Sequence, residues 1–274
     1  AGEQLVRELV YEPVRRGDPT AACGYFAGDD ARRARELADL VADPTISAIV
    51  CARGGYGCHR YVDSLDPARV RAARKPLVGY SDVTTLLLWQ RRAAGLTGVH
   101  GPMLERAGEA QRASLARLFA LLEGAVPEPM QGTGARGGRA EGRLVGGSLT
   151  LVAASLGTPW EVDTRGAILL LEDVNEAPFR IDRMLHSLRV AGKLAACKGI
   201  GVGAMVGCDD ARHPDWQAEG IVAECTEALG LPLVTGLPFG HRDDNRAWTL
   251  GARAVLDGSR GTLTQLEAGV SRRA

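Results

Sequence analysis

A serine at the end of an apolar run is the first residue whose position suggests chemistry. Residues 75–87, KPLVGYSDVTTLL, have the pattern of a short buried strand that ends at Tyr80-Ser81-Asp82 and passes directly into a helix. Such a corner exposes a serine hydroxyl, and the free N–H groups of the helix N-terminus stabilise a nucleophile or a developing oxyanion. Serine and aspartate are also common helix caps, so this motif alone leaves both interpretations open.

Two adjacent glycines follow another apolar run. The segment ARGGYG, residues 52–57, comes directly after a run rich in β-branched residues. Without a Cβ atom, Gly54 and Gly55 allow the backbone to approach another group closely. An N–H of Gly54 or Gly55 could complete an oxyanion hole with the N–H of Asp82. A tight turn between strand and helix explains the two glycines equally well.

Acidic residues end a third apolar run. Residues 168–173, ILLLED, predict a strand that ends at Glu172 and Asp173, the edge at which α/β proteins place their sites. The alternative is that Asp173 or Glu176 caps the helix that follows.

That helix also carries two arginines. Arg180 and Arg183 are three residues apart and share a helix face, so they could bind a substrate carboxylate. Exposure to solvent or pairing with Asp182 explains them as well.

Of the five histidines, two follow apparent strands. His241 lies after Gly240, shortly beyond the apolar run Leu233–Thr235, where it could act as a general base at neutral pH. His100, in the segment VHGPM, is its rival. The remaining three lie in polar or helical surroundings typical of surface residues.

The elements that would position these residues alternate between strand and helix. Short apolar runs bounded by turn residues are typical of buried parallel strands, so we expect an α/β fold with a flavodoxin-like N-terminal domain over residues 1–124 that bears Ser81. Residues 125–143 are rich in Gly, Pro and Arg and predict a linker. Residues 144–274 predict a smaller α/β domain that bears Glu172 and His241.

The same patterns predict individual elements. The expected strands are Ile46–Cys51, Pro76–Tyr80, Ile168–Leu171 and Gly199–Val206. The expected helices are Ala31–Ala42, Pro67–Arg74, Val83–Ala94, Phe179–Val190 and Trp216–Leu229. A closing hairpin is expected from Trp248–Leu256 and Gly261–Leu266 around Asp257-Gly258.

Bulk composition narrows the class of protein. The 274 residues contain 33 Lys and Arg and 33 Asp and Glu, so the charge balance does not indicate binding to nucleic acid or to an acidic membrane. Six cysteines form no C-x-x-C pair, which argues against a zinc ribbon and favours buried free thiols in a reducing compartment. The apolar stretches are too short to span a membrane, and no signal peptide is visible.

Taken together, these segments resemble the LD-carboxypeptidase family of serine peptidases, which includes murein tetrapeptide carboxypeptidase and the microcin C immunity hydrolase. The resemblance runs from about Gly24 to Leu256, and its specificity comes from the order of six motifs. In chain order they are GYFAGDDARRARELADLVADPTISAIVCARGGYG, LVGYSDVTTLLL, GVHGPM, GGSLTLVAASLGTPW, LLLEDVNEAPFRIDRML and GLPFGH.

The resemblance implies that Ser81 is the nucleophile, His241 the general base and Glu172 the carboxylate that orients it. It implies oxyanion donors at Asp82 and at Gly54 or Gly55. It further implies cleavage between an L-configured residue (L-Lys or meso-diaminopimelate) and a terminal D-amino acid of a murein peptide, without cofactor or metal, by a cytoplasmic homodimer.

Three points stay open at this stage. Arg180 is a candidate for holding the substrate carboxylate. Hydrolysis of a microcin C-type peptidyl-nucleotide is an alternative function, in which Trp160 would stack on a nucleobase, although a core tryptophan explains Trp160 as well. The family opens with a strand and a helix ahead of Leu5–Val14 that this sequence lacks. Either residues 1–16 substitute for them or the chain is truncated, and a non-catalytic binding homologue is then the third interpretation.

Overall fold

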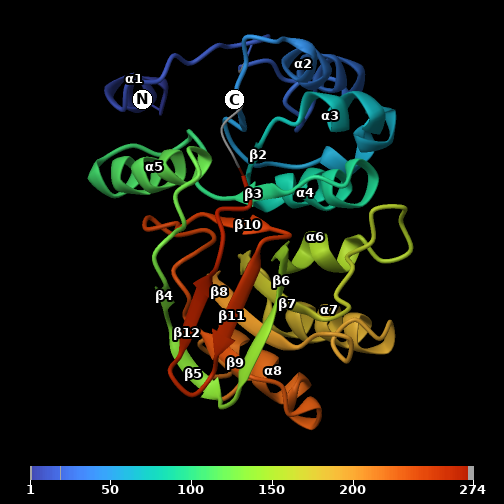
Figure 1. Ribbon diagram of the computed structural model, residues 1–274. Helices are drawn as coiled ribbons and strands as arrows, with labels where there is room; N and C mark the ends of the chain where they lie inside the picture. The colour runs from blue at the N-terminus through green and yellow to red at the C-terminus, as the bar shows by residue number, and fades with distance from the viewer. Residues whose placement is uncertain (1, 19, 271–274) are drawn as a thin grey trace.

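The computed structural model describes residues 2–18 and 20–270, and its two sheets lie one above the other (Figure 1). The first sheet has the order β1-β2-β3-β10. Its strands β1 (Ile49–Val50), β2 (Leu77–Gly79) and β3 (Gly98–His100) are parallel, whereas β10 (Trp248–Leu250) runs antiparallel to β3. Every residue of β2, β3 and β10 is buried, as the uninterrupted apolar runs predict.

The helices of this half are α1 (Gly2–Glu8), α2 (Asp30–Ala42), α3 (Pro67–Ala73), α4 (Thr84–Trp89) and α5 (Glu109–Leu122). Of these, α2, α3 and α4 lie close to the expected positions, whereas α1 and α5 were not predicted. The Asp29 side chain caps α2, and Asp66 caps α3 directly before Pro67. The expected helix Val83–Ala94 is α4 followed by one π-helical turn, Gln90–Ala94. The N-terminal segment forms α1, which packs against α5 through buried Val6.

The second sheet has eight strands in the order β4-β12-β11-β6-β7-β8-β9-β5, more than the first, although this part was expected to be the smaller domain. Its central strands β6 (Arg139–Ser148), β7 (Ala167–Val174), β8 (Gly199–Val206) and β9 (Leu233–Thr235) are parallel. The antiparallel strands are β4 (Met130–Gln131), β5 (Thr133–Arg136), β11 (Arg253–Asp257) and β12 (Thr262–Gln265), and the helices are α6 (Leu149–Ala154), α7 (Pro178–Val190) and α8 (Ala218–Cys225). The α/β class with parallel strands in two domains is therefore confirmed.

Much of the segment expected to be a linker is β-structure. Residues 130–143 supply β4, β5 and the start of β6, and only Gly132 separates β4 from β5 at opposite ends of the sheet order. The sheet therefore curls until its two ends meet. The glycines that suggested a linker allow close backbone approach instead: a Cβ on Gly142 would lie 2.6 Å from the carbonyl oxygen of Gly166.

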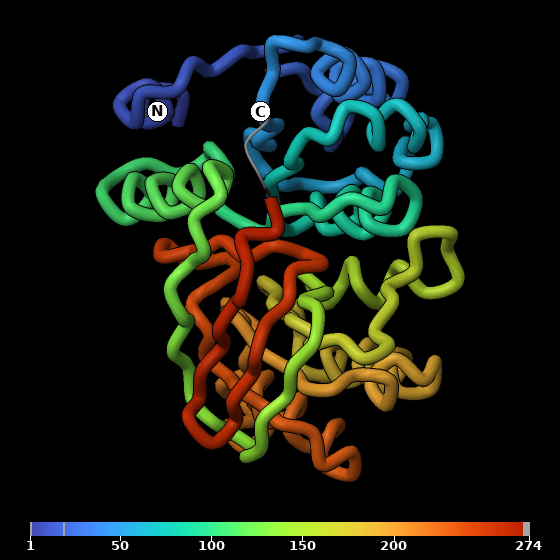
Figure 2. Tube along the Cα trace, viewed as in Figure 1, coloured from blue at the N-terminus to red at the C-terminus, as the bar shows by residue number. Residues whose placement is uncertain are grey.

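The closing hairpin forms, with two differences. Strands β11 and β12 pair from Asp257 to Thr262, so four residues connect them rather than two. Trp248–Leu250 does not join this hairpin but forms β10 of the first sheet. The chain beyond β12 also returns to the first half, as Figure 2 shows, where the carbonyl oxygen of Gly269 accepts a hydrogen bond from Thr97. The two sheets are thus joined by more than one crossing of the chain.

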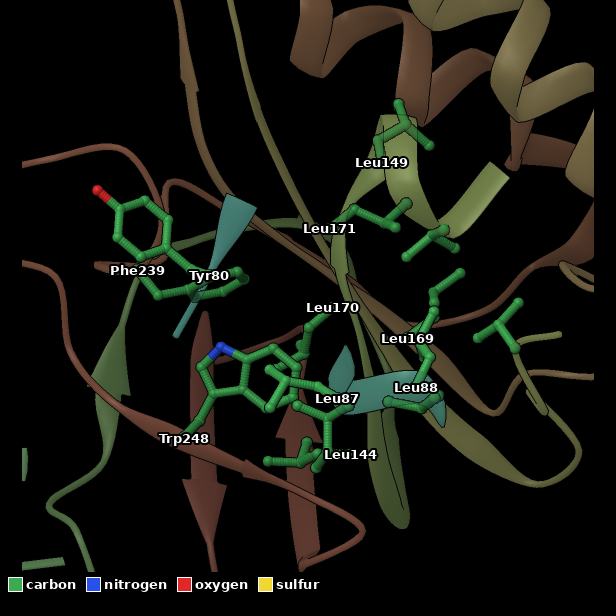
Figure 3. Close-up of a cluster of buried hydrophobic side chains, with 14 of the residues drawn as sticks. Tyr80, Leu87, Leu88, Leu144, Leu149, Leu169, Leu170, Leu171, Phe239 and Trp248 are labelled. Carbon is green, nitrogen blue, oxygen red and sulfur yellow. The ribbon is translucent and has the colours of Figure 1, made fainter. Parts of the chain in front are cut away.

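One hydrophobic core continues from one sheet to the other. Leu87 and Leu88 of α4 pack in the same cluster as Leu144 of β6 and the apolar residues of β7, as Figure 3 shows. A hydrogen bond crosses the same boundary, from the Ser148 N–H to the Thr84 hydroxyl at 3.2 Å. Because the ends of β6 and β7 lie against the start of α4, the two halves place their chemistry-bearing turns beside each other.

Candidate active site

The turn after β2 has the strained geometry expected of a nucleophile. Ser81 adopts φ 60°, in the left-handed region that residues with a Cβ rarely occupy. It begins a 3₁₀ turn, Ser81–Val83, that leads into α4. Ser81 is partly exposed, while Tyr80 and Asp82 on either side of it are buried. The serine is therefore the residue that this corner presents to solvent.

The ARGGYG segment lies against this turn. A Cβ on Gly54 would lie 2.9 Å from Ser81 Cβ and 3.1 Å from its Oγ, whereas a Cβ on Gly55 would meet nothing within 4 Å. The Asp82 carboxylate accepts a hydrogen bond from the Cys58 N–H at 2.9 Å and does not cap α4. Gly54 and Asp82, two of the expected oxyanion donors, thus lie on either side of the serine.

The fold brings Glu172 and His241 together. His241 Nδ1 lies 2.7 Å from Glu172 Oε2, and Glu172, at the end of β7, is fully buried. Gly240 places the histidine there, because a Cβ at this position would lie 2.7 Å from Glu172 Oε2. The His241 ring packs edge-on against Tyr80, with ring centroids 4.8 Å apart. The His241–Glu172 pair therefore contacts the residue that directly precedes Ser81.

His100, the rival histidine, faces the other oxygen of the same carboxylate. Its Nε2 lies 3.5 Å from Glu172 Oε1, and both side chains are fully buried. Neither ring nitrogen has a hydrogen-bond partner among residues 2–18 and 20–270. The ring stacks on Trp248 of β10, with centroids 5.0 Å and planes 15° apart. Sequence reasoning treated His100 and His241 as alternatives, whereas in the fold each of them faces one oxygen of the Glu172 carboxylate.

The two acids at the end of β7 differ in their pKa values. Burial acts to raise the pKa of Glu172, but His100 and His241 outweigh it and lower that pKa to about 2. Burial raises the pKa of Asp173 to about 6, helped by the neighbouring Glu172 charge, against hydrogen bonds from Thr150 and the Val174 N–H. Glu172 is therefore an anion at neutral pH, as an orienting carboxylate must be.

Two further candidates lie in less favourable places. Arg180 is about half exposed and pairs with Glu176 at 3.6 Å, so a substrate carboxylate would have to compete with this acid. Trp160 is 7% exposed and belongs to the hydrophobic core, as its alternative interpretation expected. Its ring is therefore closed to a nucleobase.

The structure describes all six cysteines, of which Cys23 is exposed. All six cysteines are free, and Cys58, Cys197 and Cys208 are buried. Within the described residues, no cluster of His, Cys, Asp and Glu could hold a metal ion. None of the helices among residues 2–18 and 20–270 has the length and apolar character needed to cross a bilayer.

Family models match both halves of this architecture. The LD-carboxypeptidase N-terminal domain matches residues 1–101, and the LD-carboxypeptidase C-terminal domain matches residues 141–256. The chain belongs to the LD-carboxypeptidase family. It is an enzyme, a hydrolase that acts as a carboxypeptidase.

Individual members of the family agree with this assignment. A murein tetrapeptide carboxypeptidase of Pseudomonas aeruginosa is 36% identical over 249 residues, which are 86% of this chain and 80% of that protein. The crystal structure of a muramoyltetrapeptide carboxypeptidase from Oxalobacter formigenes superposes with a TM-score of 0.87 at 27% identity, over 99% of this chain and 94% of that chain. The structure of the microcin C7 self-immunity protein in complex with aspartyl sulfamoyl adenosine also superposes with a TM-score of 0.87, over 98% of this chain and 90% of that chain. Because the two sequences are only 20% identical, this likeness shows the fold alone.

Proposed function

We propose that this enzyme removes the terminal D-amino acid from murein tetrapeptides, cutting after L-Lys or meso-diaminopimelate with a Ser81–His241–Glu172 triad. The observation that carries the proposal is the buried Glu172–His241 pair, 2.7 Å apart, packed against the turn that holds Ser81 at φ 60°. A base oriented by a carboxylate beside a strained serine is the arrangement of serine acyl transfer.

The proposed mechanism assigns each step to one of these groups. Glu172 accepts a hydrogen bond from His241 Nδ1, which leaves Nε2 free to take the Ser81 proton. Ser81 Oγ attacks the carbonyl carbon, and the N–H groups of Asp82 and Gly54 stabilise the oxyanion. The imidazolium then protonates the leaving amine of the D-residue, the C–N bond breaks, and an acyl-enzyme ester remains. His241 next activates a water molecule, which releases the shortened peptide and restores Ser81.

His100 has a positioning role in this proposal. Its Nε2 faces Glu172 Oε1 at 3.5 Å, so the His100 ring packs against this oxygen and keeps Oε2 directed at His241. A fully buried carboxylate is costly unless it is paired, and the two histidines supply that pairing.

No observation in the site favours the microcin C-type alternative, because the aromatic ring expected to stack on a nucleobase, Trp160, is buried. The strained Ser81 and the Glu172–His241 pair also argue against a non-catalytic binding homologue. From the family resemblance we further propose a cytoplasmic homodimer, which sedimentation of the purified protein and fractionation of cells would test.

The test is release of D-alanine from a tetrapeptide ending in meso-diaminopimelyl-D-Ala or L-Lys-D-Ala, with Ser81→Ala as control. We expect release by the wild type and none above background by the variant. Folded wild-type protein that releases no D-alanine, or a variant that releases it as fast as the wild type, would refute the proposal.

A further inference from the structure

The loop between Gly54 and Cys58 is fixed to the nucleophile turn at both ends. Gly54 lies against Ser81, and the Cys58 N–H donates to the Asp82 carboxylate at 2.9 Å. Tyr56, midway between these two contacts, is 50% exposed. At no more than about 3.8 Å between successive Cα atoms, Tyr56 lies within about 8 Å of either anchored residue. The loop therefore holds an open aromatic ring at the edge of the site.

Tyr56 belongs to a larger aromatic cluster. Its ring centroid lies 5.8 Å from that of Tyr25 and 5.8 Å from that of Phe26, and His59 packs edge-on at 5.5 Å. Tyr25 is 78% exposed and sits on the tight turn closed by the Cys23–Phe26 bridge. Two large exposed rings in contact are unusual on a surface that binds nothing.

Arginines hold the backbone of this cluster and share one aspartate. Arg33 of α2 donates to the carbonyl oxygens of Tyr56 at 3.2 Å and Gly57 at 3.3 Å, which fixes the loop backbone. Arg33 and Arg60 both pair with Asp30 and lie against the Phe26 ring. Tyr25 and Tyr56 expose aromatic faces and phenol hydroxyls beside these two arginines, which share the one carboxylate of Asp30. A ligand with C–H groups on one face and hydroxyls at its edges, such as a pyranose ring, fits this chemistry.

The reach of the proposed substrate matches the cluster. In a tetrapeptide cut before its last residue, three residues precede the scissile bond, and in extended form they span about 10–11 Å. A sugar attached to the first residue would therefore lie about that far from Ser81. Tyr56 lies within about 8 Å of Gly54, which itself lies against Ser81, and the Tyr25 ring centroid lies 5.8 Å from that of Tyr56.

We propose that Tyr25 and Tyr56 form a saccharide subsite that binds the muramoyl sugar of a muramoyl tetrapeptide while Ser81 attacks the terminal peptide bond. The inference rests on the proposed function and extends it, because it makes the glycan-bearing peptide the preferred substrate over the free tetrapeptide.

The experiment compares kcat/KM for a synthetic muramoyl tetrapeptide and for the free tetrapeptide of the same sequence. In the wild type we expect the muramoyl substrate to be favoured through a lower KM. Tyr25→Ala lowers that preference by about tenfold, the upper end of the energy of one aromatic contact, while Tyr25→Phe keeps most of it. The matched control is Phe179→Ala, since Phe179 is a 65% exposed aromatic residue on α7; it leaves the preference unchanged.

Three results would overturn the saccharide subsite. They are a wild type without preference for the muramoyl substrate, a Tyr25→Ala variant that keeps the preference, and equal loss on both substrates in Tyr25→Ala. Equal loss together with a lower sedimentation coefficient would instead assign the cluster to an interface between two copies of the chain. A wild type that cleaves neither peptide would refute the proposed function itself, so the two failures are distinguishable.

Discussion

Replacing Glu172 with Gln tests the pairing at the centre of the site. The carboxylate accepts from His241 on Oε2 and faces His100 on Oε1, and no solvent reaches it. A glutamine of the same shape has one oxygen and one NH₂ group. Whichever way the amide turns, one histidine faces a donor instead of an acceptor.

The size of the effect follows from the 2.7 Å His241–Glu172 hydrogen bond. A hydrogen bond to a charged group contributes about 1.5–3 kcal/mol, which is about 10- to 150-fold in rate at about 1.4 kcal/mol per factor of ten. The wrong histidine tautomer increases the loss, up to about 10⁴-fold in the serine protease triad. We therefore expect kcat to fall by about 10²–10⁴ with little change in KM.

The assay is D-alanine release at neutral pH, with circular dichroism to verify folding. Glu176→Gln is the matched control, because Glu176 is a carboxylate near the same strand end that pairs with Arg180 and does not contact His241. It should keep wild-type kcat. A folded Glu172→Gln variant within threefold of wild-type kcat would refute the proposed role of this carboxylate.

Three other changes test separate parts of the site. Gly54→Ala places a methyl group 2.9 Å from Ser81 Cβ, so we expect kcat to fall about 10²- to 10³-fold, the scale of one lost oxyanion donor; unchanged kcat would contradict the close approach. At His100, Gln keeps a hydrogen-bond donor and Phe keeps the ring stacked on Trp248. Activity should therefore rank Gln above Phe while Tm ranks Phe above Gln, and a single shared ranking would reduce His100 to a structural role. Burial raises the pKa of Asp173 from 3.8 to about 6, so the folded protein binds this proton more tightly than the unfolded chain does. The protonated form therefore stabilises the fold at low pH, and this stabilisation is lost as the pH rises through 6. Tm of the wild type should then fall between pH 4.5 and 6.5 more steeply than that of Asp173→Asn, a window in which Glu172, with a pKa of about 2, stays ionised; equal slopes would argue against a protonated Asp173.

Local patterns were sufficient to predict most elements. The buried runs that became β2, β7 and β8 are short, apolar and bounded by turn residues, and the helices α2, α3 and α7 begin at capping residues or prolines visible in the sequence. The strand-to-helix corner at Ser81 was predictable for the same reason. The positive φ of Ser81 supports its interpretation as a nucleophile, and this backbone angle could not be predicted from the sequence.

Contacts between distant segments were harder to predict. Nothing near residues 130–143 shows that their partners lie in β9, β11 and β12, so a glycine-rich stretch looked like a linker. Trp248–Leu250 looked like part of the closing hairpin because its place beside His100 depends on a return of the chain to the first sheet.

The same limit applies within the site. The sequence indicated Glu172 and His241 separately, and the family resemblance joined them. That His100 faces the same carboxylate follows only from the tertiary structure, in which His100 of β3 lies 3.5 Å from Glu172 of β7. The position of His100 at a strand end was the one signal available. Burial of Trp160 likewise depends on tertiary packing that its local sequence does not reveal.

The most direct test of the central claim is covalent labelling of the intact enzyme by a serine-reactive phosphonate, with the modified residue located by peptide mass spectrometry. We predict one equivalent of label on Ser81, with labelling about 10² times slower or more in Glu172→Gln and His241→Ala, because both lose the oriented base. Label on another residue, or labelling of Ser81 at the same rate in all three proteins, would contradict a Ser81–His241–Glu172 mechanism.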